Sequence, residues 1–149
     1  MLEKVKDTKL ELPIYLAGYL GLRREEIVGL KWKFLDFDQR ILYIHEVRTS
    51  AGDKVIIKSP KTDKSKRSLF IPDGLLELLL KCKIRQDEFK QLFGDEYENT
   101  GYVCAHENGR PYRVNSVTEW FADFLTKHGL PKIRLHDLRL VYYTMRELI

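Results

Sequence analysis

The spacing of the hydrophobic residues changes twice along this chain, and this change limits the folds that it can adopt. Near the N-terminus, apolar residues recur at the helical interval, at Leu12, Tyr15, Leu16 and Tyr19. A stretch rich in β-branched and aromatic residues follows, and helical spacing then returns for the rest of the chain. The pattern therefore predicts a mainly helical α+β domain with one small sheet.

The helical spacing predicts four more helices after the first. A short one begins near Arg24, with two acids in its first turn, where the helix dipole favours carboxylates. In the third of the four, Ser116 and Glu119 predict a capping box. The apolar faces of the three longer helices are Leu75, Leu79, Cys82, Phe89 and Phe93; Val114, Val117, Phe121, Phe124 and Leu125; and Leu138, Val141, Tyr142, Met145 and Leu148.

The middle of the chain predicts a three-stranded antiparallel sheet. Its strands are expected at Ile41–Val47, Lys54–Lys58 and Ser68–Ile71, with a turn at Ser50–Asp53 between the first two. The polar segment 59–67 separates the last two strands and contains most of the local positive charge. We therefore expect a hairpin with a basic tip.

Composition limits the number of domains and the kinds of partner and cofactor that we expect. At 149 residues with 44% hydrophobic content, residues 1–149 form one domain or part of one. A net charge of +4 and a pI near 9.0 suit a polyanionic partner. Cys82 and Cys104 are expected to be free thiols of a cytoplasmic protein. No signal peptide, membrane-spanning run, metal-ligand spacing or cofactor motif is recognisable, so we expect no metal, no cofactor and no membrane partner.

Four residues from three distant segments carry groups suited to a phosphodiester under attack. His136 and Arg139 are spaced to share one helix face. Arg23 lies between the first two predicted helices, and Lys61 lies in the basic tip. Two guanidinium groups can bind phosphate oxygens, a histidine exchanges protons near neutral pH, and a lysine can protonate a leaving oxygen.

Each of these residues also has a structural interpretation. Either arginine can form a surface salt bridge, the lysine can belong to a solvated turn, and the histidine can cap a helix. Glu26 can orient an arginine or the histidine, or simply favour its helix start. Tyr143 shares a face with His136, whereas Tyr142 falls on the apolar face.

The chain resembles the catalytic domain of tyrosine recombinases, the phage integrase family, over nearly its whole length. Ala17–Trp32 is similar to the family's first arginine box, and Leu135–Arg139 is similar to the second. Pro60-Lys-Thr62, followed by Lys66-Arg67-Ser68 and Ile71-Pro72, is similar to the hairpin that carries the catalytic lysine.

The resemblance implies a DNA strand transferase for site-specific recombination or integration, which cleaves through a 3′-phosphotyrosine and rejoins strands without metal or cofactor. It implies that Arg23 and Arg139 hold the non-bridging oxygens, that Lys61 protonates the leaving 5′-oxygen and that His136 assists proton transfer. It also implies that Glu26 positions its neighbours. The partners would be double-stranded DNA and, in a full-length parent, other protomers. The residues expected to contact DNA phosphates are Lys58, Lys64, Lys66 and Arg67.

The sequence departs from the family pattern after the second box. Leu140 stands where the family often has His, and Val141 where Thr is usual. The family's later His or Trp and its nucleophilic Tyr would lie beyond Ile149, and we expect the N-terminal DNA-clamping domain to be absent. We therefore expect a catalytic domain that lacks its C-terminal segment and its nucleophile, and that is monomeric and inactive alone. Two alternatives stay open: a non-catalytic DNA-binding remnant, and a metal-independent ribonuclease using His136 and Lys61.

Overall fold

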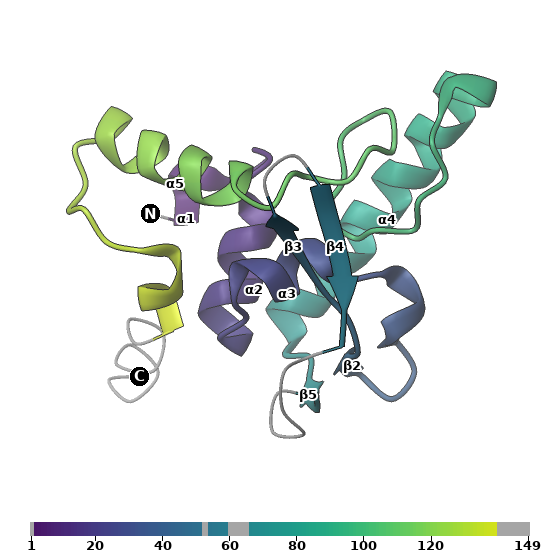
Figure 1. Cartoon of the computed structure of the whole chain (residues 1–149), viewed down its shortest axis with the longest axis horizontal. Helices are drawn as coiled ribbons and strands as arrows, with labels where there is room; N and C mark the ends of the chain where they lie inside the picture. Colours follow the sequence, from purple (N-terminus) through teal and green to yellow (C-terminus); the bar gives the residue numbers. More distant parts are fainter. Residues whose placement is uncertain (1, 52–53, 60–65, 140–149) are drawn as a thin grey trace.

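The computed structural model describes residues 2–51, 54–59 and 66–139 of the chain (Figure 1). Helices dominate the regular structure and the strands are short, so the predicted α+β class is confirmed. The α-helices are α1 (Leu2–Val5), α2 (Glu11–Leu20), α3 (Arg24–Gly29), α4 (Asp73–Phe93) and α5 (Ser116–Lys127). Short 3-10 helices are η1 (Trp32–Phe34), η2 (Gly94–Glu96) and η3 (Leu135–Asp137). The strands are β1 (Leu35–Asp36), β2 (Ile41–Ile44), β3 (Val47–Ala51), β4 (Lys54–Lys58) and β5 (Arg67–Phe70).

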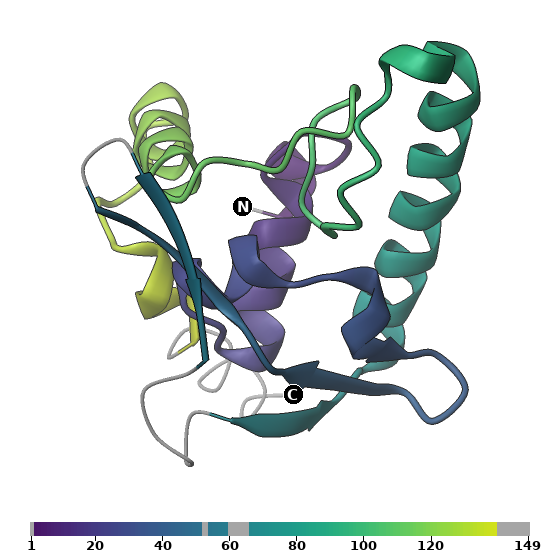
Figure 2. The ribbon, with the colours of Figure 1, turned by 45° about the vertical axis from the view of Figure 1, so that its right-hand side comes forward.

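The core forms around α2, which is apolar on most of its surface. Leu16 and Ala17 are almost fully buried, and α4 runs alongside this helix (Figure 2). Only the first half of α4 contributes to the core, through Leu75 and Leu79. Its second half extends away from the body, and Leu92 is 78% exposed there. The helices predicted at α2, α3, α4 and α5 are confirmed.

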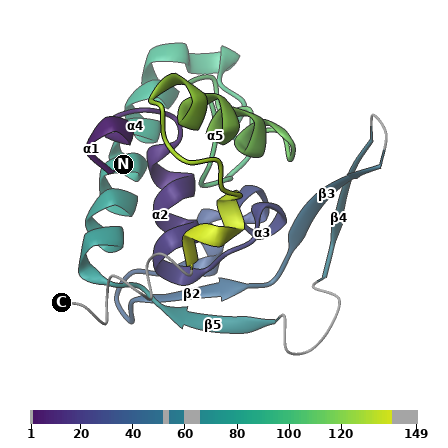
Figure 3. The same cartoon turned by 90° about the vertical axis from the view of Figure 1, so that its left-hand side faces the viewer.

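The strands form two antiparallel sheets and not the single sheet predicted. One sheet has the order β1-β2-β5, and the other pairs β3 with β4. Figure 3 shows β3 and β4 leaving the body as an arm, at an angle to β2 and β5. Strand β5 pairs with β2, with Ile44 opposite Arg67, so the predicted third strand does not continue the β3–β4 hairpin. The predicted turn at Ser50–Asp53 is also wrong at its start, because β3 continues through Ala51.

The predicted strand Ile41–Val47 is interrupted at His45–Glu46 because the chain passes against α3 at this point. A Cβ on Gly29 would lie only 2.9 Å from the backbone nitrogen of Arg48 and 3.0 Å from the carbonyl oxygen of Glu46. Such an approach is possible only beside a glycine. The long-range contact therefore determines where β2 ends and β3 begins.

Arg48 joins this strand to the interior. Its side chain is buried, and Nη1 donates to the carbonyl oxygens of Val28 at 3.0 Å and Tyr112 at 3.1 Å. Its guanidinium lies 4.7 Å from the ring centroid of Tyr102. Burial lowers the pKa of this guanidinium from its ordinary value. Arg48 is a structural residue, and sequence patterns did not single it out.

The predicted capping box of Ser116 and Glu119 is wrong. Ser116 is the first helical residue, and Asn115 is the cap, whose side chain makes no capping hydrogen bond to the helix. The hydroxyl of Thr118 instead donates to the backbone oxygen of Asn115. Cys82 and Cys104 are free thiols, as predicted. The predicted last helix is described only at its start, and the candidate residues Tyr142 and Tyr143 lie outside the described residues.

Candidate active site

Arg23 lies in the elbow between α2 and α3. Helix α2 ends at Leu20 and is capped by Gly21, whose left-handed φ of 66° lets its N–H donate to the carbonyl oxygen of Ala17 and the next N–H donate to that of Leu16. This pattern is a Schellman motif, which requires a residue tolerant of positive φ. Leu22 is then buried, and Arg23, with an extended backbone, becomes the cap of α3. The side chain of Arg23 is exposed.

Glu26 holds this elbow together. Its carboxylate is buried, and Oε1 accepts the backbone N–H of Arg23 at 2.9 Å. The guanidinium of Arg67, from the start of β5, donates to Oε2 at 2.7 Å and to Oε1 at 3.1 Å. The carboxylate therefore connects the start of α3 with a strand far along the chain. Sequence patterns could not reveal this pair, because neither residue type nor spacing identifies the partner.

The segment carrying His136 and Arg139 is anchored by the apolar residues between them. Leu135 and Leu138 are buried, whereas His136 and Arg139 are exposed. Asp137 fixes the turn, because its carboxylate accepts the backbone N–H of Arg134 at 3.0 Å and its guanidinium at 3.2 Å. These donors lower the pKa of Asp137, the backbone hydrogen bond having the larger effect.

The structure brings Arg139 to the elbow that carries Arg23. A Cβ built on Gly21 would lie 2.6 Å from Cδ and 2.9 Å from Nε of Arg139. The side chain of Arg139 therefore lies directly on the bare backbone of Gly21, two residues before Arg23. Gly21 is thus a site residue that the sequence analysis did not single out.

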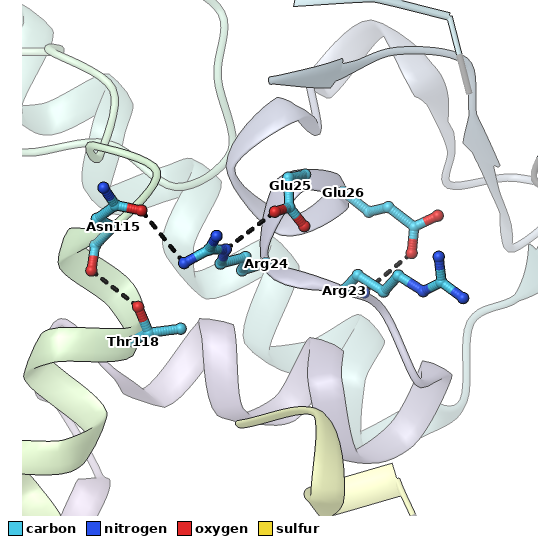
Figure 4. A network of polar contacts seen from close by, with 6 residues as sticks. All are labelled: Arg23, Arg24, Glu25, Glu26, Asn115 and Thr118. Atoms are coloured by element: carbon cyan, nitrogen blue, oxygen red, sulfur yellow. Dashed lines mark hydrogen bonds and ion pairs between the residues drawn. The ribbon is translucent and has the colours of Figure 1, made fainter. Parts of the chain in front are cut away.

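A groove of about 660 Å³ lies beside this elbow. It lies between the start of α3, the face of α5 and the segment leading into η3. Arg23 and His136 are both among its lining residues, although the side chain of Arg23 points to the side of α3 away from α5 (Figure 4). The basic residues around it are Arg23, Arg24, Lys132, Arg134 and His136.

A small polar network joins α3 to α5 beside this groove (Figure 4). Arg24 donates to the carboxylate of Glu25 at 2.9 Å and to the side-chain oxygen of Asn115 at 3.2 Å. Figure 4 shows Arg24 and Glu25 pointing towards α5, while Arg23 and Glu26 point to the other side of α3. The two adjacent arginines therefore have different surroundings, and Arg24 was not singled out from the sequence.

The basic tip is only partly described. Lys61 and Lys64 lie outside the described residues, as does the side chain of Lys58. Lys66 is exposed. Arg67, expected to contact DNA phosphates, has Glu26 as a partner, and its phosphate contact stays a prediction.

Over the described ranges, no group of three or more His, Cys, Asp or Glu side chains could hold a metal ion. Nor does this part of the chain contain a helix long and apolar enough to cross a membrane. The site offers two guanidinium groups and an imidazole, from opposite ends of the chain, near one elbow. Such a set can bind a tetrahedral anion and stabilise charge that develops on it.

Comparison with known proteins identifies the family. Residues 2–145 match the model of the phage integrase family. The chain belongs to the phage integrase family. The resemblance seen in the two arginine boxes is thereby confirmed.

Curated members of the phage integrase family align with most of this chain. A tyrosine recombinase XerC-like protein of Caldanaerobacter subterraneus subsp. tengcongensis is 30% identical over 95% of this chain and 39% of its own length. The ICEBs1 integrase of Bacillus subtilis is 29% identical over 90% of this chain and 36% of its own length. The chain thus spans less than half the length of these relatives.

Solved structures of phage integrase family proteins share the fold. The Tn1549 transposon integrase, in complex with a circular intermediate DNA, superposes with a TM-score of 0.75 at 19% identity, over 95% of this chain and 48% of that one. The catalytic core of lambda integrase has a TM-score of 0.59 at 19% identity, over 99% of this chain and 80% of that one. These likenesses support the predicted recombinase catalytic fold.

Proposed function

We propose that this chain holds the scissile phosphate of double-stranded DNA during site-specific strand cleavage and rejoining. The observation that carries the proposal is the contact of Arg139 with Gly21, which places its guanidinium beside the elbow of Arg23. Family membership supports the same chemistry, because the relatives are recombinases and integrases. We place this activity in the cytoplasm, whose reducing conditions suit the two free thiols.

In the proposed mechanism, Arg23 and Arg139 bind the non-bridging oxygens and stabilise the charge of the transition state. His136 assists proton transfer at the nucleophile, a tyrosine that forms a 3′-phosphotyrosine. Lys61 protonates the leaving 5′-oxygen. Lys58, Lys64 and Lys66 contact neighbouring phosphates, and binding is therefore salt-dependent. Other protomers complete the recombining assembly.

The proposal is tested by duplex binding over a series of salt concentrations. Arg139→Ala and Arg23→Ala should each lower the slope of log affinity against log salt by about one unit, because each removes a phosphate contact. The matched control is Arg110→Ala, which removes the same charge from an exposed residue paired with Glu98. If both site variants keep the wild-type slope, the site does not bind phosphate and the proposal fails.

Chemistry is tested in a full-length parent that supplies the nucleophilic tyrosine, with nicked duplexes of randomised sequence, which trap a covalent protein–DNA adduct. An adduct lost in Arg139→Ala but kept in Arg110→Ala supports strand transfer. Salt-dependent binding without any adduct favours the non-catalytic DNA-binding module. Cleavage of RNA but not of DNA would favour the ribonuclease and contradict the proposal.

A further inference from the structure

Both ends of the basic segment 59–66 are attached to helix α3. At its far end, Arg67 begins β5 and donates two hydrogen bonds to Glu26, at 2.7 Å and 3.1 Å. At its near end, the backbone of Lys58 is paired with Val47, whose Cα lies 3.1 Å from a Cβ built on Gly29. One short helix therefore supports both ends of the segment.

The same helix carries the proposed phosphate-binding arginine at its start. Glu26 accepts the backbone N–H of Arg23 with the oxygen, Oε1, that also accepts from Arg67. The backbone of Arg67 is itself fixed by the sheet, where it lies opposite Ile44. A two-pronged contact between guanidinium and carboxylate fixes direction as well as distance. The pair therefore ties the sheet, the start of α3 and the end of the basic segment at one point.

We infer that Arg67 is a positioning residue which, through Glu26, holds the start of α3, and with it the backbone of Arg23, against the start of β5. The inference rests on the proposed function, in which Arg23 acts on the scissile phosphate. It assigns Arg67 a role different from that of its basic neighbours. Its side chain is only 30% exposed, and its guanidinium engages both oxygens of the buried carboxylate.

Charge-conserving variants separate positioning from direct phosphate contact. Arg67→Lys keeps the positive charge but loses the two-pronged contact with Glu26. We expect about a tenfold loss of duplex affinity. The slope of log affinity against log salt should fall by more than one unit, because several phosphate contacts weaken together. Glu26→Gln removes a negative charge, which by itself should strengthen DNA binding. We expect it to weaken binding as much as Arg67→Lys does, and the double variant to be no weaker than either one.

The matched control is Arg40→Lys. Arg40 also pairs with a carboxylate, that of Asp73, at the opposite end of the β2–β5 pair, and this variant should bind DNA as the wild type does. The inference is overturned if Arg67→Lys keeps wild-type affinity and slope, or if Glu26→Gln strengthens binding. Either result would make Arg67 a direct phosphate contact.

Amide hydrogen exchange without DNA gives an independent measurement. The backbone N–H of Arg23 donates to Glu26, so Arg67→Lys should accelerate exchange of this amide and of the β5 amides. Arg40→Lys should leave the exchange of the Arg23 amide unchanged. If the wild-type chain shows no salt-dependent DNA binding, the proposed function fails. Hydrogen exchange then still tests whether the Arg67–Glu26 pair positions the backbone of Arg23. Unchanged exchange at Arg23 in Arg67→Lys would overturn the inference.

Discussion

The two arginine-bearing segments of the site begin with the same local arrangement. In the first, the carboxylate of Glu26 accepts the backbone N–H of Arg23 at 2.9 Å; in the second, Asp137 accepts that of Arg134 at 3.0 Å. Each acid lies three residues after the amide that it accepts, as in the acidic half of a capping box. The segments differ in what else the carboxylate holds.

This difference shows which segment depends on the whole fold. Glu26 is buried and also binds Arg67 of strand β5, whereas Asp137 is more exposed and also binds the side chain of Arg134 itself. An exposed pair between near neighbours contributes little to stability, because water and salt screen it. The first segment is therefore fixed by a long-range pair. The second is fixed mainly by buried leucines and by the contact of Arg139 with Gly21.

The largest expected effect is on stability when Glu26 is removed. Glu26→Ala should lower the free energy of unfolding by about 2–3 kcal/mol, somewhat below the ~3–5 kcal/mol of fully buried pairs, because Arg67 stays partly hydrated. Urea unfolding measures the change. Asp137→Ala is the paired variant and should cost much less. Equal losses in the two variants would contradict the distinction between the segments.

Gly21→Ala should affect both the fold and the site. A left-handed backbone costs a non-glycine residue about 1–2 kcal/mol, and the new Cβ would also displace the side chain of Arg139. Unfolding and duplex binding should therefore both be impaired. Gly129→Ala is a close control, because Gly129 has a similar φ of 62° but no atom within 4 Å of an added Cβ. Only Gly21→Ala should weaken DNA binding; equal binding by both variants would refute the contact.

Arg24→Ala should have a smaller effect, although Arg24 is the neighbour of Arg23. Its contacts with Glu25 and Asn115 are exposed, and their loss should change the free energy of unfolding by no more than about 0.5 kcal/mol. Thermal or urea unfolding beside the Glu26 variant tests this. A loss as large as that of Glu26→Ala would mean that the link between α3 and α5 also fixes the first segment.

Local patterns predicted the helices well, because apolar spacing of the kind seen in α2 depends on near neighbours alone. The sheet was predicted less well. The interruption of the strand at His45–Glu46 arises from the approach of Gly29 to Arg48, a contact between distant parts of the chain. No spacing rule contains such a contact.

In the candidate site, too, local motifs were predictable from the sequence and contacts between distant residues were not. Motif resemblance singled out Arg23, His136 and Arg139, and the structure places them around one elbow and its groove. The pairing of Glu26 with Arg67 was not predicted. The sequence around an arginine at the start of a strand does not reveal whether its side chain binds a carboxylate or a phosphate. The glycine that accepts Arg139 was visible in the sequence, but its function required the three-dimensional contact.

The smallest expected effect is a pH dependence at the second segment. The backbone N–H and guanidinium of Arg134 hold the pKa of Asp137 below its usual value of about 3.9. Because the folded value is the lower one, this contact stabilises the fold above about pH 3.9, and its contribution is lost as the pH falls through the folded value. The Cγ chemical shift of Asp137 should give a midpoint below about 3.9, and added salt should raise it. A midpoint at or above about 3.9 would show that Asp137 does not hold this turn, leaving the burial of Leu135 and Leu138 as the main support of His136.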